Sequence, residues 1–229
     1  MTYSSKALIQ INNLHYAYPR RDAVLTAIDF SLKAAERVVI NGDNGAGKTT
    51  LLHLIVGLKK AQKGDIYGFG ALCKSEQQFT KLRTKVGLLF QDPDDQLFCP
   101  TVLEDLMFGP LNLGFTKKQA IEKSMKILHS LGLQGFESRI THQLSGGEKR
   151  MVTLASVLVM EPEVLMLDEP TNALDQKAKL RLLHVLQALP QAMIIISHDK
   201  VFVDQLATRE LNLENGQLSD VDLKNVAVA

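Results

Sequence analysis

The stretch Gly42-Asp43-Asn44-Gly45-Ala46-Gly47-Lys48-Thr49-Thr50 matches the pattern G-x-x-x-x-G-K-[ST] at every fixed position. Residues 37–40 before it are mostly β-branched, which favours a buried strand, and residues 51–56 after it favour a helix. This order of strand, glycine-rich turn and helix is the setting in which the pattern cradles phosphate groups. We therefore predict a nucleoside triphosphate site here, in preference to a flexible glycine-rich loop.

Each kind of residue in this phosphate loop (residues 42–50) has a physical task. Glycines let the backbone curl so that successive N–H groups point at one anion, and the start of the following helix adds its dipole. Lys48 supplies a charge that can reach the β- and γ-phosphates, and Thr49 can offer its hydroxyl to Mg²⁺. The predicted nucleotide-binding residues of the loop are Gly42, Asp43, Asn44, Gly45, Ala46, Gly47, Lys48, Thr49 and Thr50.

The composition narrows the classes of protein that fit. The 229 residues suffice for a buried core, and 45% hydrophobic with 22% charged residues is ordinary for a globular protein. A net charge of +1 leaves no electrostatic footprint for nucleic acid. Cys73 and Cys99 offer neither a disulfide framework nor metal-ligand spacing, which favours a reducing cytoplasm. No apolar stretch is long enough to span a bilayer, so a role at a membrane requires a partner.

Four apolar runs, at residues 38–40, 86–90, 164–167 and 193–196, are continuous. Such runs are typical of parallel strands that are covered on both faces. Because open α/β sheets bind ligands at the carboxyl ends of their strands, we expect the polar residues that follow the runs to converge beside the phosphate loop. These residues are Gln91, Asp168, Glu169, Ser197, His198 and Asp199.

Other segments show the patterns of exposed strands and turns. Residues 8–11 and 27–32 alternate apolar and polar side chains, which predicts strands with one exposed face. Residues 16–21 between them are predicted to form a turn that carries aromatic side chains. Residues 211–218 predict a hairpin that turns at Asn215-Gly216.

Residues 92–160 are predicted to be mostly helical. Pro93, Pro100 and Pro110 punctuate a loop and a short helix around residues 102–108. A longer helix then begins at Thr116, with Gln119 three residues later as a capping box, and ends at Gly132.

The apolar residues of this longer helix recur at helical spacing, which predicts one buried face. They are Ile121, Met125, Leu128 and Leu131. We accordingly place Met125 in the core and do not interpret it as a cofactor ligand.

Two further motifs complete an ordered set. The segment Leu144-Ser145-Gly146-Gly147-Glu148, here called the signature segment, lies upstream of residues 165–170, which end in Asp168-Glu169-Pro170. Together with the phosphate loop, this order resembles the ATP-binding subunit of ABC transporters, over nearly the whole chain. The resemblance implies an α/β fold with a P-loop NTPase (RecA-like) core, a mainly parallel sheet, an N-terminal antiparallel β subdomain and an inserted α-helical subdomain. We expect a single domain over residues 1–229, with its core at 1–91 and 161–229 and its helical part at 92–160.

Asp168 and Glu169 are the predicted acids of the site. Asp168 ends a buried strand beside the phosphates, a suitable place for a carboxylate that holds Mg²⁺ through water. By resemblance, Glu169 is the general base that polarises the attacking water of an ATPase. Two acids after an apolar strand could also be simple strand-end capping, a weaker interpretation beside a phosphate loop.

The signature segment is predicted to begin a helix, because Ser145 and Glu148 have the spacing of a capping box. Its helix N-terminus and glycine N–H groups would form an outward-facing anion site. By resemblance, Ser145, Gly146, Gly147 and Glu148 contact the γ-phosphate held by an opposite subunit, so turnover needs a head-to-tail dimer, with residues 173–175 at the same interface. The family commonly carries an arginine where Met151 stands, whereas here Arg150 lies one residue earlier.

The remaining roles rest on the same resemblance. Gln91 would contact Mg²⁺ and the attacking water, and His198 would contact the γ-phosphate, although each could be an ordinary polar residue after a strand. Tyr18 matches the aromatic residue that stacks on adenine, with Tyr16 as the alternative. The other histidines show no metal-ligand spacing and are interpreted as incidental: His15, His53, His129, His142 and His184.

Residues 92–98 and 101–112 indicate the type of transporter. They look like the ATPase of energy-coupling-factor importers, particularly the branch for cobalt or nickel, although vitamin importers are similar here. The resemblance implies ATP and Mg²⁺ as cofactors, a second ATP-binding subunit of the same or a related chain, and membrane-embedded partners at the cytoplasmic face of the membrane.

Other classes fit the sequence less well. A soluble chromosome ATPase of this family would carry a long coiled coil, and a ribosome ATPase would usually carry tandem cassettes. A small-molecule P-loop kinase would not need the signature segment. A catalytically dead regulatory subunit is disfavoured because Lys48, Asp168, Glu169 and His198 are all present.

Overall fold

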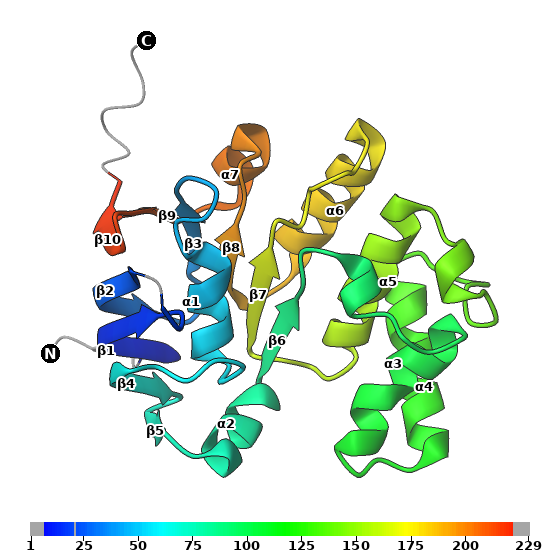
Figure 1. Cartoon of the computed structure of the whole chain (residues 1–229). Coiled ribbons are helices and arrows are strands. Elements are labelled where there is room, and N and C mark those ends of the chain that lie inside the picture. The colour runs from blue at the N-terminus through cyan, green and yellow to red at the C-terminus, as the bar shows by residue number, and fades with distance from the viewer. Residues whose placement is uncertain (1–6, 21, 222–229) are drawn as a thin grey trace, which may run out of the picture.

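The computed structural model describes residues 7–20 and 22–221, which form two sheets and a set of helices (Figure 1). An antiparallel sheet has the strand order β2-β1-β4-β5, and a six-stranded sheet has the order β10-β9-β3-β8-β7-β6. The strands are β1 (Ile9–Ala17), β2 (Ala23–Leu32), β3 (Arg37–Asn41), β4 (Lys63–Gly68), β5 (Ala71–Cys73), β6 (Val86–Leu89), β7 (Val164–Asp168), β8 (Ala192–Ile196), β9 (Arg209–Glu214) and β10 (Gln217–Asp220). The helices are α1 (Lys48–Ile55), α2 (Glu76–Arg83), α3 (Val102–Asn112), α4 (Lys117–Ser130), α5 (Gly146–Leu158), α6 (Gln176–Ala188) and α7 (Lys200–Leu206), with short 3₁₀ turns η1 (Pro93–Asp95) and η2 (Thr141–Gln143). The α/β class predicted from the sequence is confirmed.

The four continuous apolar runs are neighbouring parallel strands of the six-stranded sheet, as predicted. Strand β3 pairs with β8, β8 with β7 and β7 with β6, all in parallel. Val38 and Ile40 pack into a core shared with the antiparallel sheet and α1, while Val39 between them packs into a second core with helices of the other face. The runs are continuous because both faces of this sheet are covered.

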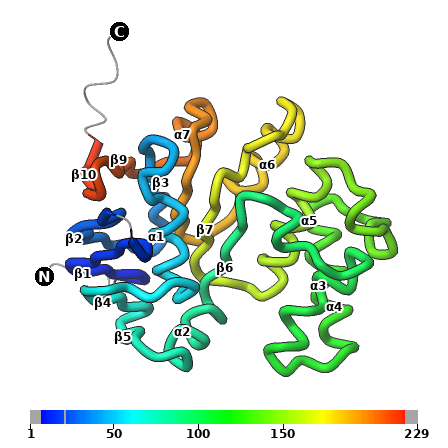
Figure 2. The backbone as a smooth tube through the Cα atoms, viewed as in Figure 1, coloured from blue at the N-terminus to red at the C-terminus, as the bar shows by residue number. Residues whose placement is uncertain are grey.

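The helices divide between these two faces. Helix α1 lies between the two sheets, whereas α3, α4 and α5 lie beyond β6 and β7, on the side away from the antiparallel sheet (Figure 2). A methyl group placed on Gly87 of β6 would press against Val157, so α5 approaches this strand closely. All three of these helices fall within residues 92–160, and the division of the chain into a core and a helical part stays a prediction. Within the described part of the chain, no helix is both long enough and apolar enough to cross a membrane.

The antiparallel strands are longer than predicted. The turn expected over residues 16–21 is wrong for Tyr16 and Ala17, which belong to β1. Asn13 in β1 and Ala27 in β2 have positive φ angles of 49° and 52°, and the pairing register of the two strands shifts between residues 11 and 17 of β1. Such irregularities interrupt the two-residue alternation, so the strand could not be followed through them in the sequence.

The predicted hairpin at the end of the described chain is confirmed. Strands β9 and β10 pair antiparallel, with Glu214 opposite Gln217. Asn215 and Gly216 between them both have positive φ angles, 50° and 74°, as a tight turn of the mirror-image type requires.

Helix α3 runs further than the short helix predicted around residues 102–108. It begins after a capping box at Thr101 and Glu104 and continues to Asn112, so Pro110 lies inside it. The prediction that Pro110 punctuates the helix is therefore wrong. A proline removes one N–H bond to the preceding turn, and here that loss falls in the last turn of the helix.

Helix α4 begins after the predicted capping box at Thr116 and is followed by Gly132 in a left-handed conformation, φ 66°. The prediction that Met125 lies in the core is wrong, because its side chain is 41% exposed. The buried positions of α4 include Ala120 and Ser124, one residue earlier in each turn. Small side chains allow close packing against α3 and α5, so size as well as hydrophobicity decided which face is buried.

Candidate functional site

The phosphate loop connects β3 to α1 and depends on its glycines. Gly42 has a φ angle of 140°, and a methyl group on it would collide with the carbonyl oxygen of Leu213 in β9. Gly47 precedes α1 with a φ angle of 106°, and a methyl group there would lie 2.7 Å from Val24. Helix α1 therefore begins at Lys48 with its first N–H groups directed at the loop.

Lys48 is 7% exposed and is held by the loop itself. Its ammonium group donates to the carbonyl oxygens of Gly42, at 2.6 Å, and Asp43, at 2.9 Å. It also lies 3.3 Å from Nε2 of His198, which follows β8. Because backbone carbonyls carry no net charge, the positive charge of Lys48 is not neutralised and is available to bind a phosphate group at the loop.

A hollow of about 690 Å³, here called the loop hollow, collects most of the predicted site residues. The predicted residues that line it are Tyr18, Asn44, Gly45, Gly47, Lys48, Thr49, Thr50, Gln91, Asp168, Glu169 and His198. Asp43 and Ala46 line a neighbouring hollow, and Gly42 contributes its carbonyl to Lys48. The expected convergence of strand ends is present for Gln91, Asp168, Glu169 and His198, whereas Ser197 and Asp199 do not line the hollow.

Asp168 is the buried acid of the loop hollow, with 3% of its surface exposed. Burial raises the pKa of its carboxyl group, and a hydrogen bond from Thr49 acts against this shift. Its Oδ1 is buried and has no hydrogen-bond partner. An orphaned carboxylate oxygen beside a threonine hydroxyl and the amide of Gln91 is a donor set that suits Mg²⁺.

Mg²⁺ held here would take its other ligands from outside the protein. The described residues contain no group of three or more His, Cys, Asp or Glu side chains placed to hold a metal ion. Mg²⁺ usually binds through one or two protein oxygens, phosphate oxygens and water, so the residues present fit an ion that arrives with a nucleotide.

Glu169 lies in a strained backbone conformation directly after β7. Its φ angle is 45°, and its N–H donates to the carbonyl of Ile196 at 2.9 Å. Its Oε1 lies 3.2 Å from Nε2 of His198, while 16% of its side chain is exposed. Strain at such a position is typical of functional sites, and here it directs the carboxylate toward the hollow, in which His198 is a shared neighbour of Glu169 and Lys48.

Tyr18 stands at the edge of the loop hollow with its ring fixed in place. Its hydroxyl lies 2.9 Å from the hydroxyl of Thr50, and Tyr16 packs edge-on against its ring at a centroid distance of 5.1 Å. The ammonium of Lys59 lies 5.1 Å from the ring centroid. Of the two tyrosines considered for adenine stacking, Tyr18 lines the hollow, whereas Tyr16 does not and packs against the ring of Tyr18.

The signature segment forms the predicted capping box at the start of α5. Glu148 accepts from the Ser145 N–H at 2.9 Å and hydroxyl at 2.8 Å, and Arg139 lies 2.8 Å from its other oxygen. The Ser145 N–H bond is the main cause that lowers the pKa of Glu148. Ser145 and Gly146 are exposed, and a methyl group on Gly146 would meet nothing within 4 Å.

The structure does not bring the signature segment to the loop hollow of its own chain. Leu144 and Gly146 line a separate hollow of about 520 Å³, here called the signature hollow, together with residues of η1 and residues 172–174. Gln91 lines both hollows. The phosphate loop and the signature segment of one chain therefore border different hollows.

Two residues of the site were missed in the sequence. Asn172 lines both hollows, and its place two residues after Pro170 was the available signal. Arg150 is 2% exposed and donates to the backbone carbonyls of Phe90, at 2.7 Å, and Gln91, at 2.6 Å. Its position, one residue before the arginine that the family commonly carries, left the local ion pairing open, and the structure shows contacts with the backbone.

Comparison with known proteins agrees with this geometry. The family described as ABC transporter matches residues 25–172. A provisionally assigned ABC transporter ATP-binding protein of Brucella suis is 52% identical over 93% of this chain and 88% of its own length. The energy-coupling factor transporter ATP-binding protein EcfA of Methanothermobacter thermautotrophicus is 40% identical over 92% of this chain and 69% of its own length.

Solved structures extend the likeness to three dimensions. The structure of cbiO1 from Clostridium perfringens, part of the ABC transporter complex cbiONQ, has a TM-score of 0.82 at 32% identity and covers 93% of this chain and 87% of that one. The family match spans the phosphate loop, the signature segment and both acids. The chain belongs to the ABC transporter family, as an ATP-binding subunit with ATPase activity.

Proposed function

We propose that this chain is the motor subunit of an energy-coupling-factor importer, working as a head-to-tail dimer at the cytoplasmic face of the membrane. The observation that carries the dimer is the separation of the two half-sites: the loop hollow holds the predicted acids and His198, while Ser145 and Gly146 face elsewhere. A second copy or a related chain, turned head to tail, would place its signature segment over the nucleotide.

The charged and polar residues at the centre of the loop hollow then have tasks in hydrolysis. Lys48 and the N–H groups of the loop bind the β- and γ-phosphates. Thr49, Gln91 and Asp168 would hold Mg²⁺, which when bound neutralises charge on the phosphate oxygens. Glu169 accepts a proton from the attacking water, and His198, whose Nε2 lies 3.2 Å from Oε1 of Glu169, turns its single Nε2–H to the γ-phosphate when the nucleotide is bound.

Closure of the dimer follows from the place of the γ-phosphate. It is the group that contacts Lys48 in one subunit and Ser145 in the other, so both contacts are lost on hydrolysis. ATP binding would thus close the dimer and hydrolysis would reopen it, and this motion would be passed to membrane-embedded subunits.

Glu169→Gln tests the dimer directly. The variant keeps the shape of the side chain but cannot accept a proton, so ATP and Mg²⁺ should trap a dimer in analytical ultracentrifugation. Glu163→Gln is a matched control, since Glu163 forms a surface pair with Lys85 at 2.8 Å, and it should behave as the wild type. A Glu169→Gln chain that binds ATP by calorimetry yet stays monomeric would refute the head-to-tail model.

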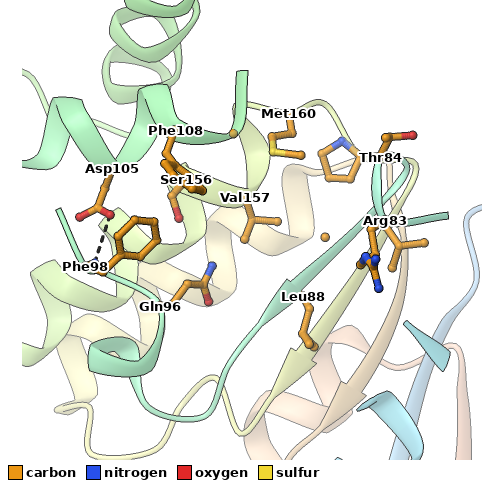
Figure 3. Close-up of a pocket in the computed structure, with 14 residues that line it drawn as sticks. Arg83, Thr84, Leu88, Gln96, Phe98, Asp105, Phe108, Ser156, Val157 and Met160 are labelled. Carbon is orange, nitrogen blue, oxygen red and sulfur yellow. Dashed lines mark hydrogen bonds between the residues drawn. The ribbon is translucent and has the colours of Figure 1, made fainter. Parts of the chain in front are cut away.

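A side hollow of about 220 Å³ is the proposed contact with the membrane partner (Figure 3). It lies between β6, α3 and α5, and Phe98 and Phe108 at its rim are 64% and 48% exposed while their rings pack edge to face at 4.8 Å. Exposed aromatic side chains beside a hollow are typical of protein interfaces. We assign it to a cytoplasmic helix of the membrane subunits.

Co-purification tests this contact. Phe98→Asp should abolish capture of the chain by its membrane subunits and leave ATP affinity unchanged. Val201→Asp is the matched control, because Val201 is 59% exposed on α7, away from the hollow. Equal capture of both variants would assign the contact to another surface.

The cargo is proposed from the resemblance of residues 92–98 and 101–112 to the energy-coupling-factor ATPases of the cobalt or nickel branch. The relative named EcfA supports the energy-coupling-factor type and names no cargo. We propose a transition-metal ion such as cobalt or nickel, with a vitamin as the alternative cargo. Uptake of each by cells that carry the Glu169→Gln chain, compared with the Glu163→Gln chain, decides between them.

A further inference from the structure

Arg150 carries a buried charge that the roles described above do not use. The residue is 2% exposed, and its guanidinium donates through Nη1 to the carbonyl of Phe90 at 2.7 Å and through Nη2 to the carbonyl of Gln91 at 2.6 Å. Its Nε is buried and has no partner. Burial lowers the pKa of this group, while the more distant carboxylates of Asp92 and Asp168 act against the shift.

Stability alone does not explain an arginine at this position. A buried cation held by carbonyl dipoles loses much of its hydration energy, so burial of the guanidinium offsets much of what its two hydrogen bonds contribute to stability. The next residue, Met151, is 3% exposed and shows that an apolar side chain packs well on the same helix. What the guanidinium adds is a fixed, two-point connection, because its planar fork can hold two acceptors in one geometry.

The connection reaches from the signature hollow to the loop hollow, because Arg150 lines only the signature hollow whereas Gln91 lines both. Arg150 lies in α5, in the turn that follows the Ser145 cap, and therefore moves with the signature segment. Gln91 lines the loop hollow, where this chain binds its own ATP. The preceding residue on the helix, Lys149, reinforces the connection through a 2.6 Å contact with Asp94 in η1.

We propose that Arg150 is a positioning residue that couples the two ATP sites of the dimer. When Gln91 shifts to meet the nucleotide of its own chain, the two bonds of Arg150 transmit the shift to α5, and so to Ser145 as it faces the nucleotide of the partner subunit. This inference rests on the proposed head-to-tail dimer. Substitution of Arg150 should leave the binding of ATP by a single chain unchanged. It should impair dimer formation and ATP hydrolysis, which both need two chains.

The test uses Arg150→Lys, which keeps the charge but offers one attachment point, and Arg150→Met, which removes both. We expect ATP affinity by calorimetry to stay within about twofold, since neither bond touches the phosphate loop. We expect kcat for ATP to fall about tenfold in the lysine variant, as for the loss of one charge-assisted hydrogen bond, and the Hill coefficient for ATP to fall toward one. Because Arg150→Met leaves two carbonyls unpaired, the lysine variant decides the question if the methionine variant does not fold.

Arg37→Lys is the matched control. Its guanidinium also donates to two backbone carbonyls, of Gln187 and Leu189 at 3.1 and 3.0 Å, but outside both hollows. A general effect of losing such bonds would lower the kcat of both arginine variants equally. That result would overturn the positioning role.

Dimer formation in the Glu169→Gln background separates this inference from the proposed function. If Glu169→Gln dimerises with ATP and adding Arg150→Lys weakens the dimer about tenfold, while Arg37→Lys does not, the coupling role is supported. If Arg150→Lys leaves dimer affinity, kcat and the Hill coefficient unchanged, the coupling role is refuted and the dimer stands. If Glu169→Gln never dimerises, the head-to-tail model fails and the coupling role fails with it.

Discussion

Replacing Lys48 by methionine should weaken ATP binding about a hundredfold while the fold stays intact. Lys48 is 7% exposed, and its ammonium donates to the carbonyls of Gly42 and Asp43, at 2.6 and 2.9 Å, so it is already oriented toward the centre of the loop. Methionine has a similar length and no charge, which removes the electrostatic attraction and little of the packing.

The magnitude follows from the charges involved. One ammonium about 4 Å from one phosphate charge is worth roughly 4 kcal/mol at an effective dielectric constant of about 20. ATP binding also draws Lys48 away from two carbonyls, which costs about 1 kcal/mol in weakened hydrogen bonds. The remaining ~3 kcal/mol corresponds to about a hundredfold change in Kd.

Isothermal titration calorimetry with ATP and Mg²⁺ measures this change, and thermal unfolding of the free protein checks the fold. Lys74→Met is the matched control: Lys74 pairs with Asp65 at 2.9 Å on the surface, with 64% of its side chain exposed, and its loss should leave Kd unchanged. A Kd for Lys48→Met within about threefold of the wild type would refute the assignment of Lys48 to the phosphates.

Three further changes test other parts of the structure. Ser145→Arg should leave ATP affinity of the single chain unchanged and stop turnover, because Ser145 lies outside the loop hollow; normal ATP hydrolysis would show that the signature segment does not act on a partner's nucleotide. Gly42→Ala should lower the free energy of unfolding in urea by about 2–4 kcal/mol, since its φ angle is 140° and the added methyl collides with Leu213 backbone; an unchanged midpoint would mean that the loop relaxes freely. Asp199→Asn should cost about 1 kcal/mol at pH 7, because the pair with Lys179 at 2.7 Å lowers the pKa of Asp199. A depressed carboxyl pKa stabilises the fold above the unfolded value of 3.8, and this stability is lost as the pH falls through the folded pKa, so the difference from wild type should shrink toward pH 3; a constant difference would contradict the ion pair.

Much of the site could be predicted because its signals are local. A phosphate loop needs glycines and a lysine within nine consecutive residues, and the capping box of Ser145 and Glu148 joins groups three residues apart. The hydrophobic runs also predicted the parallel strands, because a strand covered on both faces cannot tolerate polar residues in its interior.

The errors fell where distant packing overrides local preference. The buried side of α4 is set by how closely α3 and α5 approach, which favoured Ala120 and Ser124 over Met125. Backbone irregularities at Asn13 and Ala27 broke the alternation that would have revealed the whole of β1 and β2. The local rule predicted that Pro110 would end α3. The helix continues through it to Asn112, because the last turn of a helix loses little stability when one N–H is absent.

The amino-acid sequence by itself predicted a nucleoside triphosphate site at residues 42–50, because its glycines and lysine lie at fixed short spacings. The roles of Glu169 and His198 were predicted only through the resemblance of the ordered motifs to a known family. Only the tertiary structure decided how the site is divided. It placed Ser145 outside the hollow that holds Lys48 and Glu169, and it joined Arg150 to the carbonyls of Phe90 and Gln91, some sixty residues away. Hydrogen bonds between such distant segments depend on the packing of α5 against β6, and no local pattern of residues records that packing.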